Sequence, residues 1–595
     1  MLKKTMSFIL ALSLVCAYIG AYAADAPAPG GVSWTLDESG TLTVSGGDME
    51  DYIYMNRFDS VPWGERRGEI KAVVILPGVT RVGAYAFRGC ESLTSVTFPD
   101  GLLSVGEYAF SGCVKLKGAN LPESVESLGE YAFSGCASLS DVSLPDTLTE
   151  LPRGVFSGCS ALTRAPLPAS LDVIGEGAFS LCAALKDVSL PQGVTRIESG
   201  AFADCASLES VNIPDGAVSI GGGAFARCTS LSRVRLPSRM DNVPDGMFEG
   251  CSSLERITLP EGVKTIGADA FHGCASLTYV NLPEGLSSIS GHAFSGCALL
   301  ESVSLPSTLA EIGALSFENC ASLKTVSIPD AVTRMGIGAF QGCSSLTDAN
   351  IPRGVTTAEN SVFNSCGALE RVYLPESIKN IEPYAFYGCD SLTDIYYEGS
   401  AEDWQSVLTG DENGPLLSAS VRFGDGGHVC GFLDVYAYDS FADGVKWAYE
   451  RGITNGTSAA SFSPRSTLTR AEAVTFLWRA CGSPAPEASD CPFDDVLSDS
   501  WYGGAVLWAY ENGITRGTSD TAFSPGETLT RGQLITLLWR VSGEPGKTES
   551  PIWYADAEKW ASEHSLTKGT NAPYETDAPC PRGDTVMYLQ RVFGE

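Results

Sequence analysis

Fourteen cysteines recur at a constant interval of 23 residues, from Cys90 to Cys389. A phenylalanine stands three residues before each of them and a leucine three residues after, as Phe133 and Leu139 do around Cys136. A period that does not drift predicts a solenoid in which each unit is one coil. A lone coil buries about four large apolar side chains worth roughly 1.5–3 kcal/mol each, against an ordering cost of about 1–2 kcal/mol per residue. The coils must therefore stack to fold.

Most units continue after the leucine with alternating aliphatic residues and a proline, as in Val142, Ser143, Leu144 and Pro145. Alternation that ends at proline is typical of a short strand, so successive coils are predicted to form a parallel sheet on one face. The Ala-Phe-x-Gly-Cys segment is predicted to form the opposite wall as a turn or helical turn. Equivalent thiols point the same way and suit disulfide geometry poorly, so buried free thiols are expected.

This 23-residue pattern resembles the leucine-rich repeats of the BspA-like surface-protein family, over more than half of the chain. The resemblance implies an α/β leucine-rich-repeat solenoid with a parallel sheet on one face. It also implies caps at the two ends, because the terminal coils would otherwise expose an apolar face. Ser33–Leu36 and Thr41–Val44, on either side of a glycine-containing turn, are predicted to form a hairpin in the first cap.

A second repeat follows, with an offset of 61 residues. Gly452-Ile453-Thr454-Asn455-Gly456 matches Gly513-Ile514-Thr515-Arg516-Gly517, and Thr469-Arg470-Ala471-Glu472 matches Thr530-Arg531-Gly532-Gln533. A shorter third copy contains Pro581-Arg582-Gly583-Asp584. These copies resemble S-layer homology domains, and the resemblance implies a small all-α trimer that anchors exported proteins non-covalently to a secondary cell-wall polysaccharide, often one that carries pyruvate ketals.

The chain begins with Lys3 and Lys4, a short apolar run and Ala21-Tyr22-Ala23, as a secretory signal peptide does. The mature chain is then expected to be extracellular at the cell wall, with no transmembrane segment. The predicted boundaries are 1–24 for the signal peptide, 31–75 for the N-terminal cap, 76–423 for the solenoid, 424–431 for a linker, and 432–482, 493–543 and 551–595 for the three S-layer homology copies, the third of them degenerate.

Threonine followed three residues later by glutamate or glutamine is a capping box, so Thr469 and Thr530 are predicted to start helices. The backbone N–H groups and dipole of such a helix end favour an anion, and an arginine beside it can hold a carboxylate by two hydrogen bonds. The alternative is that each arginine pairs with a local Asp or Glu. With the family resemblance, the predicted polysaccharide-binding residues are Arg470, Arg531, Arg582, Gly456, Gly517 and Gly569. A purely conformational role for these glycines is the other interpretation.

Outward positions of the solenoid sheet are mostly Ser, Thr, Asn or Asp, with two exceptions that we interpret as a partner patch for an unknown protein or glycan. The patch residues are Arg233, Arg235, Arg256 and Tyr279, and, nearer the C-terminal end, Arg371, Tyr373 and Tyr396. Arg and Tyr are the residue types most common at interface hot spots. An ordinary solvated face is the alternative interpretation.

The net charge of −32 is spread along the chain and disfavours nucleic acid as a partner. The sequence contains no metalloprotease, serine-hydrolase or P-loop motif, and its four histidines are not clustered in it. We therefore expect no enzyme activity, no cofactor and no metal. The function predicted is that of a wall-anchored binding protein. A structural spacer of the envelope and an accessory of a secreted enzyme are the alternatives.

Overall fold

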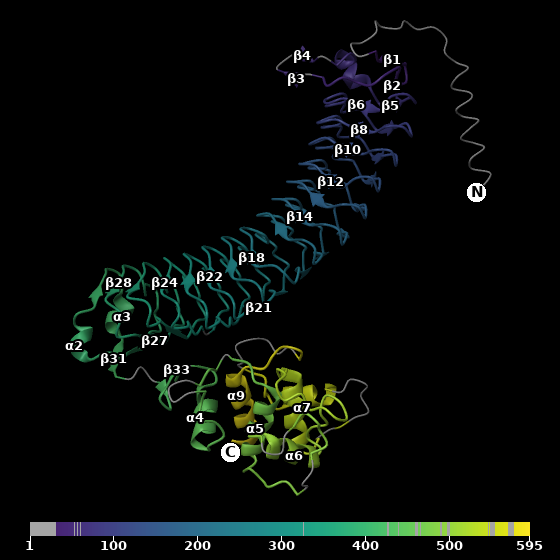
Figure 1. The fold of residues 1–595 in the computed structure, drawn as a ribbon. Helices are drawn as coiled ribbons and strands as arrows, with labels where there is room; N and C mark the ends of the chain where they lie inside the picture. Colours follow the sequence, from purple (N-terminus) through teal and green to yellow (C-terminus); the bar gives the residue numbers. More distant parts are fainter. Residues whose placement is uncertain are drawn as a thin grey trace. The chain divides into compact units, whose positions relative to one another are not determined.

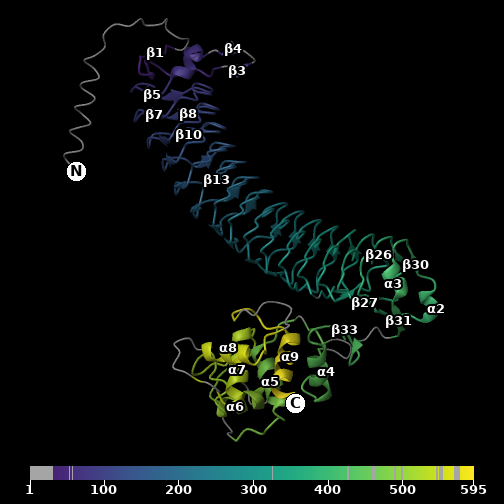
Figure 2. The same cartoon turned by 180° about the vertical axis from the view of Figure 1, so that it is seen from behind.

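The computed structural model describes residues 31–594, apart from 53, 56–57, 60, 325, 425–427, 438, 458–461, 465, 488–490, 497–499, 545–546, 548–553 and 569–575. The predicted signal peptide and Gly569 lie outside this part of the chain. The protein divides into two compact units, Met1–Pro237 and Ser238–Glu595. Both contain stacked coils, and the second also contains the α-helices (Figures 1 and 2).

The first unit opens with a cap. Its elements are β1 (Ser33–Leu36), β2 (Thr41–Ser45), β3 (Tyr54–Met55), β4 (Phe58–Asp59), the 3₁₀ helix η1 (Gly64–Glu69) and β5 (Ala72–Ile75). Strands β1 and β2 pair antiparallel, which confirms the predicted hairpin, and β2 pairs parallel with β5. Trp63 stacks on Phe87 of the first coil, with ring centroids 5.3 Å apart, and its Nε1 donates to the Ala86 carbonyl at 2.8 Å. The cap thus covers the apolar end of the stack.

The coils of the first unit place two short strands on different stretches of the repeat. The runs after the repeat leucines form a first column of strands: β7 (Ser95–Thr97), β9 (Gly118–Asn120), β11 (Asp141–Ser143), β15 (Ser210–Asn212) and β17 (Arg233–Arg235). In the two coils between β11 and β15 the same run forms isolated bridges. The run after each proline forms β6 (Arg81–Val82), β8 (Ser104–Val105), β10 (Ser127–Leu128), β12 (Glu150–Leu151), β13 (Val173–Ile174), β14 (Arg196–Ile197) and β16 (Ser219–Ile220). The first column is the predicted parallel sheet. The second is additional, and its two-residue strands are too short to show a sequence period.

The second unit repeats the two columns. The first contains β19 (Arg256–Thr258), β21 (Tyr279–Asn281), β25 (Asp348–Asn350), β27 (Arg371–Leu374), β29 (Asp394–Tyr397) and β31 (Ser420–Phe423). The second contains β18 (Asn242–Val243), β20 (Thr265–Ile266), β22 (Ser288–Ile289), β23 (Glu311–Ile312), β24 (Arg334–Met335), β26 (Thr357–Ala358), β28 (Asn380–Ile381) and β30 (Leu408–Thr409). Pairing between successive coils is parallel and joins residues 23 positions apart, as Ile266 and Ile289 show. Helices α2 (Ala401–Trp404) and α3 (Gly414–Ser418) close this stack, where Asn413 accepts a hydrogen bond from the Phe386 N–H.

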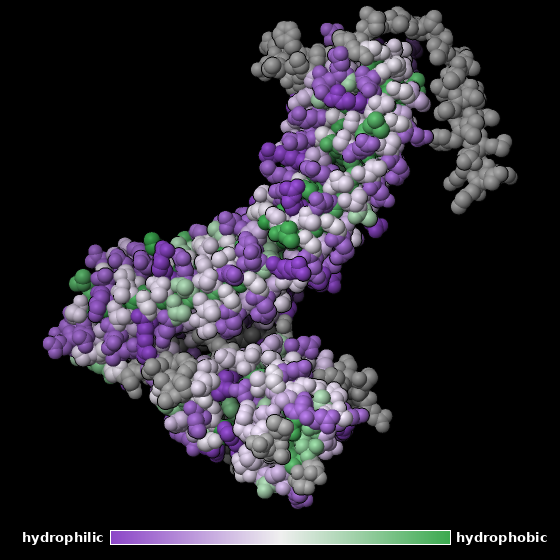
Figure 3. Space-filling model, in the orientation of Figure 1, coloured by the Kyte–Doolittle hydropathy of each residue, from purple (hydrophilic) through white to green (hydrophobic). Residues whose placement is uncertain are grey.

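The repeat residues build the core. Neighbouring phenylalanine rings stack with centroids 5.0–5.7 Å apart within each unit. All fourteen repeat cysteines are buried free thiols, as predicted. Twelve of these thiols donate to the phenylalanine carbonyl of the preceding coil, as Cys136 does to Phe110 at 3.2 Å. The Ala-Phe-x-Gly-Cys segment forms turns. At the surface, hydrophobic residues are scattered among polar ones on the face shown in Figure 3.

The C-terminal copies consist of helix pairs. The predicted linker at 424–431 includes a strand, because β32 (His428–Val429) pairs antiparallel with β33 (Phe432–Tyr436). The helices are α4 (Ala442–Glu450) and α5 (Arg470–Ala480), α6 (Gly503–Glu511) and α7 (Arg531–Val541), and α8 (Ala555–Glu563) and α9 (Arg582–Phe593). Helix α5 packs on α6, α7 on α8, and α9 on α4, so the three pairs close into a ring around one core.

Candidate functional site

The helices that carry the predicted arginines begin as their sequence indicates. Thr469 accepts a hydrogen bond from the Glu472 N–H, and the Glu472 carboxylate accepts from the Thr469 N–H at 2.9 Å, which completes the capping box. Thr530 and Gln533 form the same box. Pro581 makes no side-chain cap. The arginine in each case is the first residue of the helix, so its side chain leaves the helix end beside the neighbouring copy.

The backbone N–H groups at these helix ends are not free for a ligand. The N–H groups of Arg470 and Ala471 donate to Glu527 and Pro525 in the second copy, at 2.9 and 3.1 Å. The other two helix ends do the same around the ring: Arg531 and Gly532 donate to Ala578 and Thr576 of the third copy, and Arg582 and Gly583 donate to Ser466 and Pro464 of the first. The prediction that these donors await an anion is therefore wrong, because the loop of the next copy supplies their acceptors.

The three guanidinium groups are buried as well, with 8%, 5% and 4% of Arg470, Arg531 and Arg582 exposed. Arg470 Nε donates to the Phe523 carbonyl at 2.8 Å and its guanidinium lies over the Phe523 ring. Arg582 makes the equivalent contacts with Phe462, at 3.0 Å, and an ion pair with Glu472. Each of these two arginines thus holds the loop of the following copy. The structure favours the alternative interpretation, local pairing, for Arg582.

Arg531 differs from the other two, because its Nη2 forms a buried ion pair with Asp584 Oδ2 at 2.7 Å. Burial raises the pKa of the Asp584 carboxyl, against the opposing effect of the Arg531 charge. Burial also lowers the pKa of the Arg470 guanidinium. Among the described residues, Arg470 alone of the three has no carboxylate at ion-pair distance. An external carboxylate would therefore meet the least competition at Arg470.

The predicted glycines occupy tight turns. Gly456 and Gly517 adopt positive φ of 80° and 75°, and their N–H groups donate to Thr454 Oγ1 and Thr515 Oγ1. A Cβ on Gly517 would lie 2.4 Å from the Ala522 carbonyl oxygen and 2.5 Å from the Phe493 ring. The packing of the protein itself therefore requires glycine at position 517, in line with the conformational interpretation.

The predicted partner patch is partly closed by its own side chains. In the first unit, Arg233 and Arg235 are exposed, and Arg235 pairs with Asp215 at 3.1 Å. In the second unit, the expectation that Tyr279 and Tyr373 face solvent is wrong, because only 6% of each is exposed, whereas Tyr396 is half-buried. The cause is stacking between equal positions of adjacent coils: Arg256 covers the Tyr279 ring, and the rings of Tyr373 and Tyr396 lie 4.7 Å apart.

Arg371 of the same cluster is also engaged, since it forms two hydrogen bonds with the Asp348 carboxylate, at 2.5 and 2.9 Å. A bidentate pair of this kind is among the strongest protein ion pairs. Burial and hydrogen bonding thus leave Arg233, Arg235 and Arg256 as the exposed cationic groups of the predicted patch.

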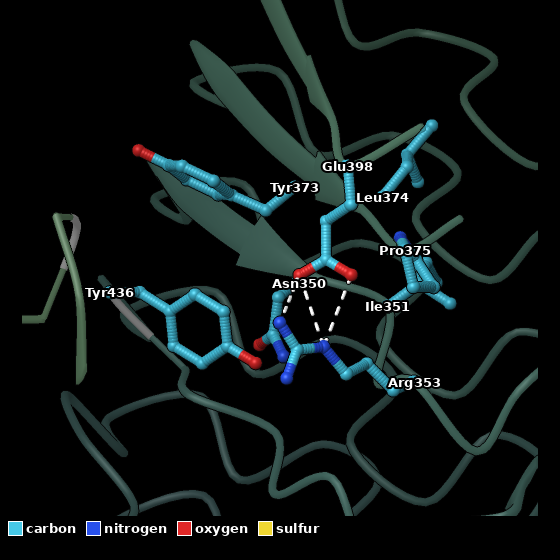
Figure 4. A pocket seen from close by; sticks show the side chains of 8 residues that line it. All are labelled: Asn350, Ile351, Arg353, Tyr373, Leu374, Pro375, Glu398 and Tyr436. Atoms are coloured by element: carbon cyan, nitrogen blue, oxygen red, sulfur yellow. Dashed lines mark hydrogen bonds and ion pairs between the residues drawn. The ribbon is translucent and has the colours of Figure 1, made fainter. Parts of the chain in front are cut away.

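A small hollow beside Tyr373 contains a charge cluster that sequence analysis missed (Figure 4). Arg353 binds both oxygens of Glu398, with Nη2 to Oε1 at 2.9 Å, and His428 Nε2 lies 3.4 Å from the same oxygen. The Tyr436 hydroxyl hydrogen-bonds the Asp330 carboxylate at 3.2 Å. Burial would raise the pKa of Glu398, but hydrogen bonds from His428 and Arg353 lower it below its ordinary value. These contacts join β32 and β33 to the last coils.

The comparisons with protein families agree with this architecture. The model of the BspA-type leucine-rich repeat region matches in six copies over residues 66–186, 172–300 and 264–393. The model of the S-layer homology domain matches residues 431–474 and 492–535, which are the first two copies. The third copy falls outside these matches, although its helices α8 and α9 complete the ring. None of the helices among the described residues is long and apolar enough to cross a membrane.

Similar curated proteins include a surface-layer 125 kDa protein of Lysinibacillus sphaericus, 31% identical over 30% of this chain and 16% of its own length. An endoglucanase of Bacillus sp. (strain KSM-635) is 36% identical over 16% of this chain and 10% of its own length. The chain therefore spans only a small part of these relatives.

Among solved structures, a leucine-rich repeat protein from Bacteroides ovatus is 23% identical, with a TM-score of 0.39, and the match covers 68% of this chain and 100% of that one. A leucine-rich cell surface protein from Faecalibacterium prausnitzii is 24% identical, with a TM-score of 0.36, over 65% of this chain and 98% of that one. Since the repeat model matches more than half of its residues, the chain belongs to the family of proteins with BspA-type leucine-rich repeats.

Proposed function

We propose that this chain is a non-catalytic cell-surface protein, held non-covalently at the cell wall by its C-terminal ring. The observation that carries the proposal is the ring itself: three helix pairs close on one core, and two of them match the S-layer homology domain. A surface-layer protein is among the similar proteins, which supports the same location. The proposed partner is a secondary cell-wall polysaccharide with carboxylate groups, such as pyruvate ketals.

Within the ring we propose Arg470 as the residue that meets the carboxylate. Its guanidinium lies at the junction of the first and second copies, has the largest exposed fraction of the three arginines and has no described carboxylate at ion-pair distance. Burial lowers the pKa of the Arg470 guanidinium, and the negative charges of Glu527 and Asp495 only partly offset that effect. Arg531 and Arg582 already hold Asp584 and Glu472, so their proposed role is to support the ring.

Co-sedimentation of the full chain with purified cell-wall sacculi tests both statements. We expect the parent protein to sediment with the sacculi, and Arg470→Ala to lower the bound fraction with an unchanged near-ultraviolet circular dichroism spectrum. Arg516→Ala is the matched control, because Arg516 is exposed and lies in the Ile-Thr-x-Gly loop. A parent chain that stays in the supernatant would contradict wall anchoring. Full retention of a folded Arg470→Ala variant would contradict only the role of Arg470.

For the coils we propose a binding role through the exposed cations of β17, Arg233 and Arg235. The internal pairing of Arg371 with Asp348 favours the alternative function, a structural spacer. Binding of the full chain to an array of acidic glycans and to whole cells distinguishes them. A binding module should lose signal in the Arg233→Ala/Arg235→Ala variant, whereas a spacer should show no signal that depends on these residues.

A further inference from the structure

Two of the four histidines lie one coil apart on the turn side of the repeats, beside an aspartate. Asp269 and His292 are 23 residues apart and occupy the same position of successive coils, and His272 follows Asp269 by three residues. One ligand atom from each side chain lies within 4.8 Å of the other two. The separation in sequence hides this cluster from a search for closely spaced ligands, but the repeat period predicts it.

The backbone holds the three residues in a fixed arrangement. Asp269 and His292 both adopt the left-handed conformation, with φ of 56° and 55°. The Asp269 N–H donates to the Gly291 carbonyl at 3.1 Å, and the His292 N–H donates to the Ala314 carbonyl at 2.9 Å. The His272 N–H donates to the Asp269 carbonyl at 3.0 Å. Hydrogen bonds between coils therefore set the spacing of the ligands before any ion arrives, which lowers the entropic cost of binding.

One ligand nitrogen lacks a partner. His272 Nδ1 is shielded from solvent and makes no hydrogen bond with any described residue. It lies 3.6 Å from Asp269 Oδ1, which is too long for a hydrogen bond. A tetrahedral ion bound to nitrogen and oxygen at about 2.0–2.2 Å would separate two ligands by roughly 3.4 Å. The observed distance thus suits a shared ion better than a direct contact.

A fourth oxygen lies close by. Glu318 Oε2 is 3.9 Å from His292 Nδ1 and accepts a hydrogen bond from the Ser295 hydroxyl at 3.0 Å. Ser295 and Glu318 occupy the His272 position in the next two coils. This carboxylate can complete the coordination directly or through a water molecule, as outer ligands commonly do in protein metal sites.

We propose that Asp269, His272 and His292 bind one divalent transition-metal ion, with Glu318 at the edge of the site. Two imidazoles and one carboxylate suit Zn²⁺, Ni²⁺ or Cu²⁺, whereas Ca²⁺ and Mg²⁺ prefer sites made of oxygen ligands alone. The ion bridges two coils, because Asp269 and His272 belong to one coil and His292 to the next. The expectation from the sequence that the chain binds no metal rested on the absence of closely spaced ligand motifs.

Titration calorimetry of the full chain with Ni²⁺ and with Zn²⁺ tests the proposal. We expect one site, an affinity lowered at least about tenfold in His272→Gln and in His292→Gln, a smaller loss in Asp269→Asn, and little heat with Mg²⁺. His564→Gln is the control, because it removes a histidine outside the site. Cu²⁺ added in equal amount should show coupling to two imidazole nitrogens by electron paramagnetic resonance, and to one in His272→Gln.

Equal affinity in the parent and in the His272→Gln/His292→Gln variant would overturn the proposal, and so would the absence of any Ni²⁺ or Zn²⁺ binding to the folded chain. Loss of binding in His564→Gln with the site residues intact would place the ion in the ring instead. Circular dichroism of each variant confirms that the coils remain folded. The three residues lie in turns and are half exposed, so the substitutions should leave the coils folded.

Discussion

The coils and the C-terminal ring each consist of copies of their own repeat, but the two regions differ in how the first and the last copy are shielded from solvent. The coils stack without closing on themselves, so an end coil needs a separate cap, such as Trp63 stacked on Phe87. The helix pairs form a closed circle, in which α9 packs on α4 and no copy is terminal. Among the coils, each repeat phenylalanine stacks on the phenylalanine of the neighbouring coil, as Phe110 does on Phe133. In the ring, each arginine contacts a residue of another type in the next copy, a phenylalanine for Arg470 and Arg582 and an aspartate for Arg531. We therefore expect the stability of the coils to change most when all coils are altered together, and the stability of the ring to change when a single contact is removed.

The largest expected effect is on the repeats at alkaline pH. The pKa of ten repeat thiols is raised, in nine of them chiefly by burial and in Cys205 chiefly by a hydrogen bond with Cys228. For Cys182, Cys274, Cys320 and Cys389 the pKa rises from 9.0 to about 12. Because the pKa of each thiol is higher in the folded than in the unfolded chain, its contribution to the free energy of unfolding is fully present below pH 9 and is lost as the pH rises toward 12. At pH 10 each thiol should lower the free energy of unfolding by about 1 kcal/mol, and the ten together should lower it by on the order of 10 kcal/mol. Calorimetry of the full chain should show the repeat transition falling steeply between pH 8 and about 10.

The ring provides the internal control for that measurement. Among its described cysteines, burial raises the pKa of Cys580 to about 12 and also raises the pKa of Cys481 and of Cys430, so the ring should lose on the order of 3 kcal/mol at pH 10, well below the loss in the repeats. Equal shifts of the two transitions would contradict the thiol explanation. The transitions can be assigned with the ring variant described next.

Arg531→Ala should produce the second largest effect. Removing one partner of a buried ion pair costs about 3–5 kcal/mol, because Asp584 would remain buried with no cation. Urea unfolding followed by tryptophan fluorescence should show a less stable ring and unchanged repeats. Arg531→Met/Asp584→Leu should recover much of the loss, since it removes both charges. Arg516→Ala, at an exposed position, should change little. A stable Arg531→Ala ring would mean that the ion pair does not hold the copies together.

Gly129→Ala should have a smaller effect, confined to the first unit. A Cβ at this position would lie 2.3 Å from the Glu107 backbone nitrogen of the preceding coil. Overpacking of this kind costs about 1–3 kcal/mol. Gly101→Ala is the matched control, because nothing lies within 4 Å of its added Cβ, and it should change stability by less than about 0.5 kcal/mol. Hydrogen exchange should locate the change in the coils next to Gly129, and equal behaviour of the two variants would contradict close contact between coils.

Much of the repeat architecture follows from the sequence because one position recurs in the same environment fourteen times. The phenylalanine, cysteine and leucine positions, the strand after each leucine and the hairpin Ser33–Leu36 with Thr41–Val44 could be predicted from spacing and alternation. The two-residue strands of the second column could not, because a period cannot be read from two residues. Tyr279 and Tyr373 were expected to face solvent, since strand alternation says nothing of the side chains that stack on them.

The same limit applies to the ring. Local sequence determined the capping boxes at Thr469 and Thr530, because a cap depends on residues within one helical turn. The tertiary structure alone decided what the helix ends bind, since the acceptors of Arg470 and Arg582 belong to another copy, 53 and 120 residues away. The sequence by itself determined the stacking of the coils, because the phenylalanine, cysteine and leucine positions recur at one spacing. Only the folded chain decided how the ring closes, because its contacts join unlike residues across copies.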